Sequence, residues 1–113
     1  MSEHDLETIE LSIEQAQKTV DMMNAVLTLS KDKNFEKVIH EGYFEKEASR
    51  LVLLKADPAM QKDEDQLAIT KAIDAIGYFR QYLRSVIQIG RMAENSLRDH
   101  EQTREEVYAE GLN

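Results

Sequence analysis

Apolar residues recur at intervals of three and four along the first part of the chain. The members of this row are Leu6, Ile9, Ile13, Ala16, Val20, Met23 and Leu27. Such spacing places all of them on one stripe of an α-helix. The positions on either side are polar, so the stripe is narrow and suits a single partner helix. The pattern predicts a first helix over about residues 5–30.

The periodic pattern stops at SKDKN, residues 30–34, whose serine, aspartate and asparagine are typical of helix caps and turns. Apolar positions resume at Phe35 and continue beyond Leu51, with Gly42 between them as the mark of a kink or a close contact. Asp57-Pro58 ends the segment, because proline lacks an amide donor and disfavours helical geometry in the preceding residue. We expect a second helix over about residues 34–56.

The longest periodic row begins after KDED. Asp63 and Gln66 resemble a capping box, in which two side chains satisfy the free amides at the start of a helix. The apolar row that follows contains Ile69, Ala72, Ile76, Phe79, Leu83, Val86, Gly90, Ala93, Leu97, His100, Arg104 and Val107. The opposite edge is polar and contains Asp74, Gln81, Gln88, Asn95 and Gln102. We expect a third helix over about residues 64–109, with Gly111 as its C-cap.

Together these elements predict an all-α protein with a single domain over residues 1–113. The first two helices together are about as long as the third, which favours a long antiparallel helical hairpin. A compact, coiled-coil-like bundle of the three helices is the alternative, and the pattern does not choose between them.

The third helix has a wider apolar face over residues 73–93 than elsewhere. Residues 75–93 contain three arginines and no acid, although the chain has 22 acids against 14 lysines and arginines. A carboxylate enclosed by apolar neighbours would lose its hydration, whereas arginine can lay its stem on such a surface and keep its head in water. We therefore predict an interface and a homo-oligomer. The predicted interface residues are Ile73, Ile76, Phe79, Tyr82, Leu83, Val86, Ile87 and Ile89.

A second apolar surface is predicted from residues that fall outside the regular rows. These residues are Leu11, Met22, Leu29 and Ile89. Single exposed apolar side chains are common on proteins, but several together indicate a contact surface.

Composition agrees with a helical protein and excludes several classes. The chain has one proline, four glycines and no cysteine, so neither a disulfide framework nor a thiolate nucleophile is available. The net charge of −8 opposes general binding to DNA or RNA, whose phosphates attract clustered bases. No apolar run approaches the roughly 18 residues of a membrane span, and the acidic start differs from a secretory signal. We expect neither nucleic acid nor a membrane as partner.

The usual signatures of catalysis and metal binding do not occur. There is no GxSxG elbow, no glycine-rich phosphate loop and no HExxH pair. Glu36 and His40 are four residues apart, but one such pair is a weak match to a metal site. His100 lies on the apolar row, where a partly buried histidine is ordinary. We expect no cofactor, no metal and no enzymatic activity.

Arginine recurs every seven residues along the third helix at Arg84, Arg91 and Arg98. The simplest interpretation is a solvated row paired with acids such as Glu94. Arginine beside tyrosine can also hold phosphates or stack on bases, which predicts a second kind of site for an anionic partner. The residues of that site would be Tyr78, Arg80, Arg84, Arg91 and Arg98, with Tyr82 beside them.

Three stretches, EGYFEKEASRLV, ADPAMQ and IDAIGYFRQYLR, resemble a set of short helical proteins of unassigned function encoded by tailed bacteriophages. The resemblance covers residues 34 to about 106. It implies a phage origin and a role in virion building or in handling host factors, and it implies no catalytic residues.

Three functional hypotheses follow. The first is a non-enzymatic phage protein that self-associates, contacts other phage or host proteins, and occurs in the host cytoplasm or in the virion. The second is a host-directed acidic inhibitor that imitates nucleic acid or occupies a basic groove. The third is a small-molecule sponge that holds a nucleotide between Tyr78, Arg80, Tyr82 and Arg84.

Overall fold

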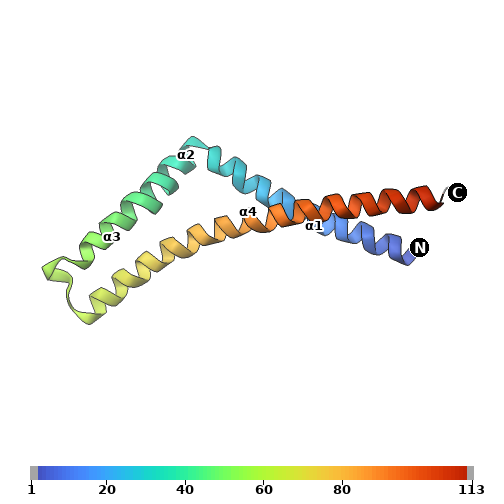
Figure 1. Cartoon of the computed structure of the whole chain (residues 1–113). Helices are drawn as coiled ribbons and strands as arrows, with labels where there is room; N and C mark the ends of the chain where they lie inside the picture. Colours follow the sequence, from blue (N-terminus) through green and yellow to red (C-terminus); the bar gives the residue numbers. More distant parts are fainter. Residues whose placement is uncertain (1–2, 112–113) are drawn as a thin grey trace. The chain divides into compact units, whose positions relative to one another are not determined.

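The computed structural model describes residues 3–111, and these are helical almost throughout, with no strand in that range (Figure 1). Helix α1 spans Glu3–Lys31. The second helical segment consists of α2 (Lys33–Phe35), η1 (Glu36–Glu47) and α3 (Ala48–Lys55). The 3-10 helix η2 (Pro58–Met60) precedes α4, which spans Asp63–Gly111. The predicted all-α class is confirmed, and the ends of the three predicted helices agree with the observed ends to within about two residues.

The chain divides into two compact units. Unit 1 contains the residues up to Leu27 together with those from Ser85 onward, and unit 2 contains Thr28 to Arg84. Helix α4 contributes to both units. The assignment of residues 1–113 to one domain stays a prediction.

In unit 1, α1 packs antiparallel on the second part of α4. Tyr108 hydrogen-bonds to Glu10, and Gly90 lies against Met23. Residues later in α1 therefore contact residues earlier in α4, as in an antiparallel pair. All seven positions of the predicted α1 stripe are buried or partly buried, which confirms the stripe. Val26, beside the stripe, is buried as well.

At Gly90 these two helices approach each other closely. A Cβ atom built on Gly90 would lie 2.3 Å from Cβ of Met23. No real side-chain contact is that short, so only a glycine fits here without moving a helix.

The long apolar row that was predicted on α4, from Ile69 to Val107, is buried or partly buried at every position, which confirms it. The polar edge of the same helix, from Asp74 to Gln102, is exposed at every position, as predicted.

Unit 2 has its own apolar core. Leu51, Ile69 and Ile76 are its buried centre, and these residues join α3 to the first part of α4. Partly buried residues surround them: Tyr43, Phe44, Ala48, Leu54, Met60, Ala72 and Ile73. The ring of Phe79 lies 5.6 Å from that of Phe44 and 6.3 Å from that of Tyr43, centre to centre. Aromatic pairs at such distances add stability beyond the area that they bury.

The turns follow the predicted stop signals, with one correction. Asp32 accepts hydrogen bonds from the amides of Asn34 and Phe35, so it caps the second helical segment. Asp57, before proline, is extended, as expected. The predicted capping box at Asp63 is wrong: Gln66 instead donates to the carbonyl of Lys55, at 2.9 Å, and to that of Met60, at 2.8 Å. Its side-chain amide thus joins the start of α4 to the last residue of α3 and to the last residue of η2.

Gly111 also departs from its predicted role. It lies within α4, and no described glycine has a positive φ, so it does not form a left-handed C-cap. The last described residue of the helix is thus a helical glycine.

The middle of the second helical segment is a π-helix, which the sequence pattern did not predict. η1 covers twelve residues, and a π-helix closes its turns with i→i+5 bonds instead of i→i+4. Phe35, Ile39, Phe44 and Ala48 are separated by four or five residues and are all partly buried. The wider turn keeps them on one face, whereas Val38 turns outward and is exposed. Gly42, expected at a kink or a close contact, lies within this wide turn at a close contact: an added Cβ would lie 3.2 Å from the Lys37 carbonyl.

Candidate interaction surface

The eight predicted interface residues separate into two groups. Ile73 and Ile76 belong to the core of unit 2, and Phe79 packs against its aromatic rings. Leu83, Val86 and Ile87 are partly buried. Tyr82 and Ile89 are exposed by more than half of their surface. The apolar face of α4 is thus covered on one side by its own chain and open on the other.

The open side follows a second periodic row on α4, here called the outer row. It contains Tyr78, Tyr82, Ser85, Ile89, Met92 and Ser96, and all six are exposed. Their separations alternate between four and three, the spacing of a helix–helix contact. Each position comes one residue before a member of the buried and partly buried row that runs from Ile69 to Val107. One residue corresponds to a rotation of about 100° around the helix. Helix α4 therefore has two adjacent rows, one covered by its own chain and one exposed.

A groove lies between α1 and α4 in unit 1, on the side of the outer row. Its volume is about 290 Å³, and Lys18, Thr19, Met22, Val86 and Ile89 line it. Met22 and Ile89 rise beside it, with 54% and 55% of their surfaces exposed. We call this the α1–α4 groove.

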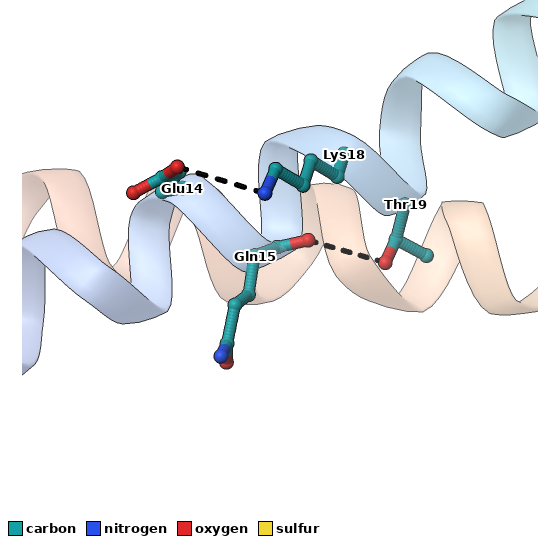
Figure 2. A network of polar contacts seen from close by, with 4 residues as sticks. All are labelled: Glu14, Gln15, Lys18 and Thr19. Carbon is teal, nitrogen blue, oxygen red and sulfur yellow. Dashed lines mark hydrogen bonds and ion pairs between the residues drawn. The ribbon is translucent and has the colours of Figure 1, made fainter.

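The polar atoms of the groove already have partners within α1 (Figure 2). The hydroxyl of Thr19 donates to the carbonyl of Gln15 at 3.2 Å. The ammonium of Lys18 extends along the helix towards the carboxylate of Glu14, 3.6 Å away. The groove surface that is free to contact another molecule is mostly apolar. Burial of such surface in a contact is favourable.

The opposite edge of the α1–α4 pair is polar. There the hydroxyl of Tyr108 donates to Oε1 of Glu10 at 2.9 Å. This hydrogen bond, together with the negative charge of Glu10, raises the pKa of Tyr108 above its ordinary value of 10.0. A contact between residues this far apart in sequence joins the ends of the two helices. The two edges of the pair therefore differ in chemistry: the groove edge is apolar, and the edge with Tyr108 is polar.

The predicted anionic site does not form one cluster. Tyr78 and Tyr82 lie on the outer row, whereas Arg80 and Arg84 are each two residues beyond them, a rotation of about 200°. The tyrosines and these arginines thus face different sides of α4 and cannot surround one nucleotide together. All five residues of the predicted site, Tyr78, Arg80, Arg84, Arg91 and Arg98, are exposed.

The arginine row also differs from its simplest interpretation. Arg84 and Arg91 form no ion pair with an acid of residues 3–111, unlike Lys18, which pairs with Glu14, and Arg50, which pairs with Glu47. Arg98 hydrogen-bonds to the side-chain oxygen of Asn95 rather than to Glu94. The row is a set of solvated cations.

The histidines lie in ordinary surroundings. The ring of His40 stands edge-on between those of Phe35 and Phe44, at 6.2 and 5.5 Å between ring centres. His100 lies on the apolar row of α4 and is partly buried, as predicted. In the described part of the chain, no three histidine or acidic side chains converge to hold a metal ion.

No helix among residues 3–111 combines the length and the apolar content that a bilayer span requires. The chain matches no protein-family model, no curated protein and no solved structure at a significant level.

Proposed function

We propose that the chain is a non-enzymatic protein of a tailed bacteriophage that acts through helix-mediated self-association and contacts with other proteins, in the virion or its assembly. The observation that carries this proposal is the open apolar side of the α1–α4 pair, where Met22 and Ile89 stand exposed beside a groove. The phage origin is supported by the resemblance of EGYFEKEASRLV and IDAIGYFRQYLR to short phage proteins.

Energetics support association. Exposed large apolar residues occur in both units: Leu11, Met22, Ile89 and Met92 in unit 1, and Val38, Val52, Leu53, Leu67, Tyr78 and Tyr82 in unit 2. Full burial of one such side chain contributes about 1.5–3 kcal/mol. Loss of rigid-body and side-chain freedom opposes this gain, so several residues must be covered together for a stable contact.

The role in a particle is tested by mass spectrometry of purified virions from an infection with the phage that encodes the chain. The proposal expects this chain in the particle, or in assembly intermediates such as proheads, at a constant ratio to the major capsid or tail proteins. Its absence from particles and from all assembly intermediates would contradict the role in building.

A second candidate function is a host-directed acidic inhibitor. The observation that favours it is a row of exposed acids at Glu7, Glu14 and Asp21 on α1, seven residues apart. Such a row resembles the regular charge of a polyanion and fits a basic groove. Constant incorporation of the chain into particles would argue against this candidate.

A further inference from the structure

We infer that the occupant of the α1–α4 groove is α1 of a second copy of this chain, which lies antiparallel along the outer row of α4 in unit 1. This inference rests on the proposed self-association and names the surface and the partner helix. The result is a two-fold arrangement of four helices, two from each copy.

The shape of the surface favours a second copy. A two-fold interface uses the same patch on both molecules, so the patch must offer both protruding and recessed features. The groove supplies the recess, floored by Thr19 and Val86, and the exposed side chains of Met22 and Ile89 supply the protrusions. In the two-fold arrangement, Met22 of one copy lies over Ile89 of the other, and the reverse contact occurs at the symmetry-related position.

A small-molecule ligand fits this surface less well. Ligand sites combine apolar walls with a few polar groups that point at the ligand. Here the hydroxyl of Thr19 is bound to its own helix and the ammonium of Lys18 points towards Glu14. No polar group is left to orient a ligand among the residues that line the groove. A helix needs no such group, because its apolar side chains fill the space.

Charge selects an acidic helix for the groove. Lys18 is the one charged residue among those that line it. On the α4 side, the outer-row residues Ser85, Ile89 and Met92 carry no charge, so no acid of α4 repels an acidic helix there. Helix α1 is the complement, because residues 3–27 contain one base, Lys18, and six acids: Glu3, Asp5, Glu7, Glu10, Glu14 and Asp21.

The outer side of α1 also carries the apolar residues that such a contact needs. Leu11 and Met22 are eleven residues apart, about three helical turns, so they lie on the same side of α1. Both have 54% of their surface exposed. An α1 helix can therefore insert Leu11 and Met22 into a second molecule while its acids remain at the rim.

The test compares two variants of the full chain by light scattering. Ile89→Glu places a carboxylate in the proposed contact twice, once from each copy. Leu67→Glu is the matched control, because Leu67 is on the same helix with the same exposed fraction, 55%, but belongs to unit 2. Helix content, followed by circular dichroism, should be unchanged in both variants, since both positions are exposed.

The expected result is that Ile89→Glu weakens dimerisation by at least about 100-fold, because its carboxylate would be buried against the apolar side chains of the partner's acidic α1 helix. Leu67→Glu should dimerise like the wild-type chain. A wild-type dimer that Ile89→Glu leaves intact would overturn the inference and leave self-association standing through another face. A wild-type chain that is monomeric at all concentrations would remove the proposed self-association itself.

Crosslinking tests the pairing of the helices, and the absence of cysteine from the chain makes it direct. Chains carrying Met22→Cys and chains carrying Ile89→Cys are mixed and oxidised. The arrangement expects the mixed disulfide dimer in excess of either homodimer, because Met22 of one copy faces Ile89 of the other. A statistical mixture of the three dimers, or no dimer, would contradict the antiparallel placement of α1 on the partner's α4.

Discussion

The two units of this molecule hold α4 by different means. In unit 1, α1 approaches so closely that a glycine is required at position 90, and the buried side chains on α1 are the aliphatic Val20, Met23 and Val26. In unit 2, the second helical segment widens into a π-helix and packs aromatic rings against Phe79. Close backbone approach leaves a thin contact with an uncovered flank, whereas the aromatic cluster fills space with large side chains.

This difference explains why a groove forms on unit 1. Thr19 and Val86 are short side chains at the junction of α1 and α4, and they cannot cover the space between the larger Met22 and Ile89. In a contact between only two helices, few side chains are available to cover the edges of the contact. A further helix is therefore the natural complement to unit 1.

The largest effect is expected from a cavity in the core of unit 2. Ile76→Ala removes most of a side chain that is 5% exposed and should lower the free energy of unfolding by about 3 kcal/mol. Leu67→Ala on the same helix should change it by less than about 0.5 kcal/mol, because Leu67 is exposed. Urea unfolding followed by circular dichroism measures both. Equal losses in the two variants would show that Ile76 is not in a packed core.

The same substitution at two glycines of α4 should have opposite effects in the two units. Gly90→Ala forces a Cβ into Met23 and should cost about 2 kcal/mol, because the helices must move apart. Gly77→Ala in unit 2 meets no atom within 4 Å and should stabilise α4 by up to about 1 kcal/mol through helix propensity. Thermal melting of the two variants and the wild type shows whether each substitution lowers or raises the stability. Stabilisation by Gly90→Ala would refute the close approach at Met23.

The start of the second helical segment depends on one cap. Asp32→Ala removes the acceptor for the amides of Asn34 and Phe35 and should cost about 1 kcal/mol. Asp32→Asn keeps an oxygen at the same place and should retain most of the stability. Hydrogen exchange at the amides of residues 33–36 should quicken in the alanine variant and stay slow in the asparagine variant; no change in either would contradict the cap.

The smallest effect is expected from the polar edge of unit 1. Because the hydrogen bond to Glu10 raises the pKa of Tyr108 in the folded state, this contact stabilises the fold fully below pH 10.0, the pKa of an ordinary tyrosine. The contribution is lost as the pH rises through the higher folded value. Tyr108→Phe should abolish this part of the pH dependence. Titration of tyrosinate absorbance should show a late-ionising component in the wild type that is absent from the variant; identical late components in both would contradict the assignment to Tyr108.

Much of the fold could be predicted because the helices are simple in pattern. The rows that begin at Leu6 and Ile69 are covered at every predicted position, since a three–four rhythm maps directly onto one helical face. Asp32 and Pro58 mark breaks through local chemistry, which a sequence shows. These features depend on neighbouring residues only.

Features that depend on contacts across the chain were missed. The amide of Gln66 prefers the carbonyls of Lys55 and Met60 to a local cap, and only the folded loop brings them within reach. Gly90 looks like any small residue of the row until the approach of α1 is known. The π-helix was missed as well, although the step of five residues from Ile39 to Phe44 is longer than the steps of an α-helical stripe.

The candidate surface was predicted in outline. Met22 and Ile89 were expected on an exposed apolar surface, and both line the groove. The outer row was missed because Ser85 and Ser96 interrupt its apolar members, so hydrophobicity alone does not reveal the spacing. The tyrosines and arginines of the predicted anionic site lie on different faces of α4, because adjacency in sequence is not adjacency around a helix, and binding of an anionic partner stays a prediction.

The most direct test of the central claim, that α4 has a second face made for another copy, is the mass of the wild-type chain in solution. Light scattering over a dilution series from micromolar to millimolar concentration should show a species of twice 13.0 kDa that dissociates on dilution. A constant mass of 13.0 kDa across the whole series would contradict the claim.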